Sequence, residues 1–122
     1  MNIPENLFYT KDHEWLKLDG DIATIGITDF AQKELGDIVF VDVDSVDEEL
    51  DAEEAFGTIE AVKTVSDMFM PVAGTVIELN EQLDDQPELI NKDAYGEGWI
   101  IKIADASEVE AMLTAEQYKE LI

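Results

Sequence analysis

Hydrophobic and polar residues alternate along most of the chain, which is the period-two pattern of half-buried β-strands. Residues 14–18 and 22–27 show this alternation on either side of an Asp-Gly-Asp turn signal, and they predict a β-hairpin. Further strands are expected over residues 37–43, 75–80 and 99–103. The pattern therefore predicts a mainly β protein.

Helical signals are few and short. Thr28 or Asp29 is positioned to cap a helix of one or two turns, and Gly36 supplies a left-handed stop. Capping-box patterns at residues 107–110 and 114–117 predict two short helices after the last strand. The sequence thus adds one internal helix and a short helical C-terminus to the β framework.

Two polar segments are expected to connect these elements. Residues 44–54 carry too few apolar side chains to be core, so we expect an exposed, solvated run of acids. Residues 81–98 are polar and turn-rich, with helical fragments around residues 87–91.

A second hairpin is predicted from residues 56–62 and 65–70, with Lys63 and Thr64 between its arms. Lys63 is the only cation between residues 34 and 91, a stretch that holds 17 acids. A lysine at the tip of a stiff hairpin suits an attachment point, whereas the ordinary alternative is a surface lysine that offsets local negative charge.

Composition limits the classes of function. The 122 residues include 7 lysines, no arginine, no cysteine and 30 acids, for a net charge of −23. The length fits one domain over residues 1–122, and 46% hydrophobic residues suffice for a core. So few, scattered cations argue against nucleic-acid binding, and the lack of cysteine excludes disulfides and thiol catalysis. The longest uncharged stretch, residues 68–77, is too short to span a membrane.

Catalytic and targeting signals are weak. The acids are so numerous that no acid–base pair stands out, and none has the spacing of a metal-binding loop. His13, the single histidine, is expected to be structural. No secretory or transit pattern precedes Lys11, so we expect a cytoplasmic chain. An amine attacks an acyl group only when deprotonated, and no second cation lies near Lys63 in the sequence to activate it, so a separate enzyme would have to deprotonate and acylate it.

Several spaced blocks resemble the glycine cleavage H-protein family over nearly the whole chain. They lie at residues 13–15, 25–29, 31–32, 35–37, 39–42, 59–63, 66–67, 71–74, 87–91 and 98–99. In that family the lysine of a Glu-Ser-Val-Lys segment carries lipoic acid in amide linkage, and the match places it on Lys63. The resemblance implies the barrel-sandwich hybrid of lipoyl and biotinyl carriers, a β-rich α+β fold.

The resemblance also implies a non-catalytic carrier of the glycine cleavage system. Such a carrier shuttles the aminomethyl group of glycine from a pyridoxal-phosphate-dependent glycine decarboxylase to a tetrahydrofolate-dependent aminomethyltransferase, and dihydrolipoamide dehydrogenase then reoxidises the lipoyl arm. A lipoate ligase or an octanoyl or lipoyl transferase would attach the group. We expect a monomer, because a carrier that docks at several enzymes gains little from covering its own surface.

The match also assigns roles around the lysine. Glu60, Ala61, Val62 and Thr64 would present the hairpin to the lipoylating enzyme. Glu14 and Asp67 fall in blocks that would line a cleft sheltering the loaded arm.

The chain departs from the family at two of these positions. Ala61 stands where serine is common, and Phe30 stands where histidine is common. Because Ala61 lies two residues before the lysine, the first departure bears on recognition by the lipoylating enzyme.

Four alternative functions can be compared with this pattern. A biotinyl carrier usually has its lysine between methionines, and the lipoyl domain of a 2-oxoacid dehydrogenase is shorter and built around Asp-Lys-Ala. Neither pattern occurs around Lys63. An H-like protein acting mainly as a lipoate relay to other lipoyl domains stays open as the alternative function. An unmodified acidic scaffold protein is the remaining reading.

Overall fold

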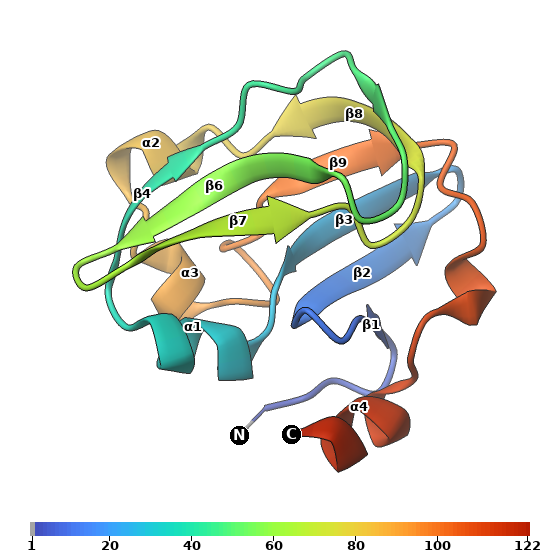
Figure 1. The fold of residues 1–122 in the computed structure, drawn as a ribbon, viewed down its shortest axis with the longest axis horizontal. Helices are drawn as coiled ribbons and strands as arrows, with labels where there is room; N and C mark the ends of the chain where they lie inside the picture. Colours follow the sequence, from blue (N-terminus) through green and yellow to red (C-terminus); the bar gives the residue numbers. More distant parts are fainter. Residues whose placement is uncertain (1) are drawn as a thin grey trace.

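Two antiparallel sheets form the body of the protein (Figure 1). The computed structural model describes residues 2–122. One sheet has six strands in the order β1-β2-β3-β9-β8-β5, and the other has three in the order β4-β6-β7. The strands are β1 (Phe8–Tyr9), β2 (Glu14–Asp19), β3 (Ile22–Ile27), β4 (Ile38–Asp42), β5 (Glu49–Leu50), β6 (Ala55–Ala61), β7 (Val65–Phe69), β8 (Gly74–Leu79) and β9 (Ile101–Ala104). The mainly β architecture expected from the pattern is confirmed.

Short helices lie around the two sheets. They are α1 (Asp29–Leu35), α2 (Gln82–Asp85), α3 (Leu89–Lys92), the 3-10 turn η1 (Val109–Ala111) and α4 (Ala115–Leu121). Thr28 caps α1 by accepting a hydrogen bond from the backbone N–H of Ala31, and Gly36 ends the helix at φ 85°. Both ends of α1 thus follow the sequence prediction. No helix within residues 2–122 is long and apolar enough to cross a membrane.

The main core lies between the inner faces of the two sheets. Leu16, Ile25 and Ile101 come from the six-stranded sheet, while Ile59 and Met68 come from the three-stranded sheet. All five side chains are buried, so the hydrophobic effect holds the two sheets face to face. The predicted hairpin of β2 and β3 pairs without a bulge, from Glu14 opposite Ile27 to Asp19 opposite Ile22.

The acidic connection contains more structure than its composition indicated. Its acids are exposed as expected, but Leu50 is buried in the core, and β5 pairs with β8. Ser45 is also buried, and its hydroxyl donates to the carbonyl of Phe56 at 2.8 Å. The prediction of a wholly solvated loop is therefore wrong at these two positions. A single apolar residue every few positions is enough to anchor a loop.

The C-terminal capping boxes have different outcomes. Thr114 and Gln117 form the predicted box at the start of α4. Ser107 caps nothing, because Glu108 adopts a left-handed φ of 55° and the segment makes only the short turn η1. A short helix does begin near this position, as the sequence predicts, but it is the 3-10 turn η1. The predicted cap at Ser107 is wrong, because the backbone of Glu108 leaves the helical region.

Candidate attachment site at the β6–β7 hairpin

Lys63 lies at the tip of the hairpin formed by β6 and β7. The backbone N–H of Ala61 donates to the carbonyl of Thr64 at 2.7 Å and closes the turn. The N–H of Val62 donates to the carbonyl of Asp37 at 3.1 Å, which ties the tip to the chain before β4. Lys63 is exposed, and in Figure 1 the β6–β7 loop projects beyond α1 at the left edge of the molecule. The lysine therefore lies at the end of a hairpin whose turn is held in place by two backbone hydrogen bonds.

The side chain of Lys63 lies over Gly36, the residue that ends α1. A β-carbon placed on Gly36 would lie 3.5 Å from Cε and 4.0 Å from Nζ of Lys63. These are ordinary van der Waals distances, so the lysine packs directly over the end of α1 without excluding a β-carbon. What requires glycine at residue 36 is its backbone, with φ 85°.

Asn91 of α3 fixes the backbone beneath the lysine. Its amide group donates to Gly36 O at 2.9 Å and to Gln32 Oε1 at 2.8 Å. Its Oδ1 accepts from the N–H of Ile38 at 2.9 Å. One side chain therefore joins the end of α1 to the start of β4, and nothing in the spacing of residues 87–91 indicated this role.

A cleft of about 230 Å³ opens between α1 and β7, beside the hairpin. We call it the α1–β7 cleft. Its apolar wall includes Ile27, Phe30, Leu35, Ile59 and Met68, and its acidic residues are Asp12, Glu14, Glu34 and Asp67. None of the lining residues, all within the described chain, is cationic. The cleft therefore combines an apolar surface with a negative electrostatic field, and it begins next to the glycine on which Lys63 rests.

Glu14 is the buried carboxylate of this cleft, with 3% of its surface exposed. Thr10 Oγ1 donates to its Oε1 at 3.0 Å, and the N–H of Phe69 donates to its Oε2 at 2.9 Å. Burial raises the pKa of Glu14 to about 7, although these two hydrogen bonds act in the opposite direction. Near neutral pH, Glu14 is therefore close to half-protonated.

His13 lies in the same wall in a left-handed backbone conformation with φ 68°. Its Nδ1 is 2.8 Å from the hydroxyl of Tyr118 in α4, and its ring lies 4.8 Å from the ring of Phe30. Burial lowers the pKa of His13. These contacts fit the structural role expected for this histidine.

Tyr118 joins two walls of the cleft. Besides contacting His13, its hydroxyl is 2.8 Å from Thr28 Oγ1, the group that caps α1. Its ring stacks on Tyr9 with centroids 4.9 Å apart. The C-terminal helix thus supports the cleft from outside, a link that no motif in the sequence indicated.

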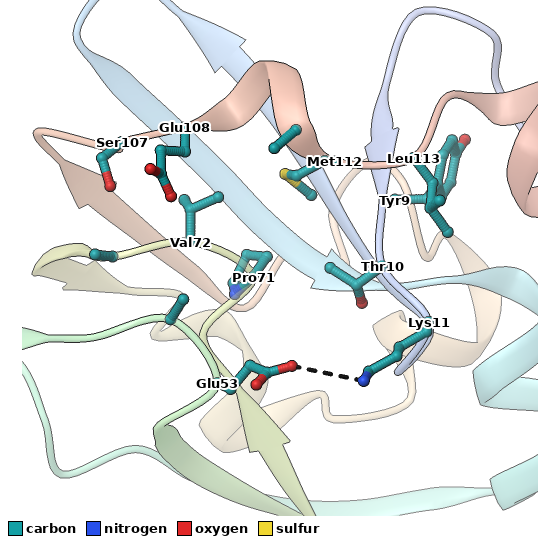
Figure 2. Close-up of a pocket in the computed structure, with 13 residues that line it drawn as sticks. Tyr9, Thr10, Lys11, Glu53, Pro71, Val72, Ser107, Glu108, Met112 and Leu113 are labelled. Atoms are coloured by element: carbon teal, nitrogen blue, oxygen red, sulfur yellow. Dashed lines mark ion pairs between the residues drawn. The ribbon is translucent and has the colours of Figure 1, made fainter.

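A larger hollow of about 310 Å³ lies away from the lysine (Figure 2). Thr10, Pro71, Val72 and Met112 are among its lining residues, and none of its lining comes from the β6–β7 loop. Lys11 and Glu53 form an exposed ion pair at 3.8 Å beside it. The α1–β7 cleft, in contrast, is lined by Ile59, Ser66 and Asp67 of the hairpin strands and borders the hairpin.

The structure separates the residues expected around the lysine by exposure. Glu60, Val62 and Thr64 are exposed. Ala61 is buried opposite Ile38, so its side chain faces the core and not the solvent. Of the two residues expected in the arm-sheltering cleft, Glu14 is buried in the wall, and Asp67 is exposed beside it.

Comparison with known proteins agrees with this geometry. The family model of the glycine cleavage H-protein matches residues 7–122. The glycine cleavage system H protein of Bacteroides thetaiotaomicron is 60% identical, over 100% of this chain and 98% of the relative, and that of Halothermothrix orenii is 53% identical over 97% and 94%.

Structural comparison gives the same result. The crystal structure of a glycine cleavage system H protein from Mycobacterium marinum has a TM-score of 0.88 and 39% identity, with 97% of each chain covered. The two-sheet architecture is thus the barrel-sandwich fold expected from the resemblance. A family match over nearly the whole chain, high identity and a shared fold lead to one conclusion: this chain belongs to the glycine cleavage H-protein family.

Proposed function

We propose that this chain is the lipoyl carrier of a glycine cleavage system and that Lys63 is the residue to which lipoic acid is attached. The observation that carries the proposal is the braced, exposed position of Lys63 at the tip of the β6–β7 hairpin, next to the α1–β7 cleft. An amine in this position is accessible to a modifying enzyme, while the backbone of the hairpin turn that carries it is held by hydrogen bonds.

Attachment requires an activated acyl donor supplied by a separate enzyme. The ε-amine of Lys63, once deprotonated, forms an amide bond with the carbonyl carbon of the lipoyl donor. The bond from that carbon to AMP or to another leaving group breaks, and one proton is released. Lys63 loses its positive charge in this step, so the tip becomes neutral.

The residues around the cleft fit such a group. An extended lysine joined to a lipoyl chain reaches on the order of 10 Å or more. That length is enough to lay the arm along the apolar wall that Phe30, Leu35 and Ile59 provide. When attached, lipoic acid would supply a disulfide whose S–S bond breaks as one sulfur bonds to the aminomethyl carbon derived from glycine and the other becomes a thiol.

The acidic residues of the cleft have a separate role in this proposal. An amine brought into the cleft would face Glu14 and Asp67. A carboxylate that an apolar wall shields from water attracts a protonated amine more strongly than it would in bulk water. The apolar wall also excludes water, which protects a group that hydrolyses readily.

The proposed partners follow from the shuttle. Glycine decarboxylase would load the arm, the aminomethyltransferase would unload it, and dihydrolipoamide dehydrogenase would reoxidise it. A monomer of net charge −23 would be steered towards basic surfaces on these enzymes, and the steering would weaken with added salt. One rigid domain can then present the same arm to several active sites.

The test is acylation of the purified protein by a lipoate ligase with lipoate and ATP. We expect the intact mass to increase by one lipoyl group, and peptide mapping to place the group on Lys63. Lys63→Arg should show no increase, whereas the control Lys17→Arg, at an exposed lysine on β2, should be acylated like the wild type. An unmodified wild type, or a group on another lysine, would refute the proposal.

A further inference from the structure

The outer face of the three-stranded sheet carries an apolar strip beside Lys63. Eight large hydrophobic side chains within residues 2–122 are exposed, and half of them belong to this strip. They are Val39 (45% exposed), Phe40 (51%), Val62 (76%) and Val65 (62%). Single exposed apolar residues are ordinary, but a group of four on one small sheet points to a contact surface.

Strand pairing places these side chains together. Phe40 of β4 lies opposite Glu60 of β6, and Glu60 lies opposite Val65 of β7. Residues directly opposite in an antiparallel sheet project from the same face, so Phe40, Glu60 and Val65 form one row. Val39 directly precedes Phe40 at the bulge of β4. Val62 follows Glu60 by two residues, so the alternation of β6 continued past Ala61 places it on the same face, nearer the tip.

Acids surround the strip. Glu60 lies within the row, and Asp42 and Asp67 pair with Thr58 in the parallel row one step farther from the tip. Asp37, whose carbonyl holds the N–H of Val62, is exposed at the other end. A complementary partner therefore presents an apolar patch bordered by lysine or arginine.

The strip lies next to Lys63, whose Nζ is the atom on which an acylating enzyme would act. Lys63 rests on Gly36, three residues before Val39, and follows Val62 directly in the chain. An enzyme that acylates Nζ must bring its active site to the hairpin tip itself. Enzymes that act on the far end of the attached arm are separated from the tip by the length of the arm, on the order of 10 Å.

We propose that the strip formed by Val39, Phe40, Val62 and Val65 is the docking surface for the enzyme that acylates Lys63. This inference rests on the proposed function, because it assumes that Lys63 is the acceptor. It adds residues on β4 and β7 to the hairpin tip, and it gives the partner a stated chemistry: an apolar patch with a basic border around the entrance for the lysine.

The experiment compares Phe40→Gln with Leu18→Gln. Phe40 and Leu18 are similarly exposed, at 51% and 48%, but Leu18 lies on β2 in the other sheet. The rate of acylation by a lipoate ligase is measured against the concentration of unmodified protein, with lipoate and ATP saturating. For Phe40→Gln we expect KM to rise and kcat/KM to fall about tenfold, the effect of losing a central interface residue. Leu18→Gln should stay within twofold of the wild type.

A second measurement separates docking of the acylating enzyme from a general defect. Wild type and Phe40→Gln are acylated to completion, and the reduction of the attached group by dihydrolipoamide dehydrogenase and NADH is followed. We expect equal rates within twofold, and unchanged thermal unfolding of the variant. Val65→Gln serves as a second variant and should behave in the same way as Phe40→Gln.

Three results would overturn the inference. The first is a wild-type KM for both strip variants, and the second is an equal rise of KM in Leu18→Gln. The third is a strip variant whose rate falls equally in the acylation and dehydrogenase assays. A wild-type protein that is not acylated at Lys63 would instead refute the proposed function itself, so the two failures are distinguishable.

Discussion

The backbone N–H of Phe69 donates a 2.9 Å hydrogen bond to Oε2 of Glu14. This bond joins β7 of the three-stranded sheet to β2 of the six-stranded sheet at the α1–β7 cleft. The hairpin that carries Lys63 is thereby linked to a carboxyl group that changes its charge near neutral pH. The cleft and the hairpin are mechanically connected through this pair.

Stability should depend on pH through Glu14. Burial raises its pKa from 4.5 to about 7, so folding favours the protonated form. As pH rises from 4.5 to 7, the unfolded chain ionises this group first, and the folded state loses up to about 3 kcal/mol of relative stability. Glu14→Gln removes the titration, so its unfolding free energy relative to the wild type should increase over that range.

Urea unfolding of both proteins at several pH values measures this difference in unfolding free energy. The other acids contribute equally to both proteins, so their contribution cancels in the difference. NMR titration of the Glu14 side-chain carbonyl gives its pKa directly. A flat difference between pH 4.5 and 7, or a Glu14 pKa near 4.5, would contradict the prediction.

Gly36→Ala should impair both stability and acylation. Its φ of 85° and ψ of −158° lie in a region that suits only glycine, so the substitution should cost about 1–3 kcal/mol. The strained residue directly precedes Asp37, whose carbonyl accepts from the N–H of Val62 at the hairpin tip, so acylation of Lys63 should slow as well. The control is Gly20→Ala, at φ 64° with open space around it, which should destabilise by about 1–2 kcal/mol but leave acylation of Lys63 unchanged. Equal acylation of the two variants would show that the backbone at Gly36 does not help to position Lys63.

Asn91→Ala should loosen the backbone between the end of α1 and the start of β4, which lies beneath Lys63. It leaves the N–H of Ile38 without its side-chain partner, at a cost of about 1–3 kcal/mol. Asn80→Ala is the matched control, because Asn80 also makes three side-chain hydrogen bonds, to Glu97, Trp99 and Gln82. Both variants should unfold at lower urea concentrations, but only Asn91→Ala should also slow acylation. A slower rate in both would indicate loss of stability alone.

Tyr118→Phe should destabilise the protein by about 1–3 kcal/mol, because the variant loses the hydroxyl shared by His13 and Thr28. NMR signals of His13 and of the first turn of α1 should shift. Tyr95→Phe provides the control for the His13 signals, since its hydroxyl contacts the backbone of Asp29 and Asn2 and not His13. Unchanged His13 signals in Tyr118→Phe would contradict the proposed support of the cleft by α4.

The elements predicted from sequence are those set by local physics. Thr28 and Gly36 mark the ends of α1 because a cap and a left-handed stop act within one turn. The β6–β7 hairpin follows from its own alternation, and the exceptional charge environment of Lys63 is visible in the chain itself. Both signals need only neighbouring residues.

What escaped prediction depends on contacts between distant segments. Strand β5 is two residues long, so no periodicity indicates it. The burial that raises the pKa of Glu14 comes from the packing of the two sheets, and the hydroxyl of Tyr118 reaches His13 across 105 positions in the chain. The resemblance could place Glu14 beside the arm, but its protonation state required the folded structure.

The position of α4 has a practical consequence. The helix packs against β1, where Tyr9 and Leu113 exchange backbone hydrogen bonds of 2.9 Å. Figure 1 places this end of the molecule well away from the tip of the β6–β7 hairpin. A tag fused after Ile122 would therefore allow the protein to be immobilised on a sensor surface with the lysine facing free solution. Binding of each enzyme to the unmodified and acylated forms can then be compared on one chip.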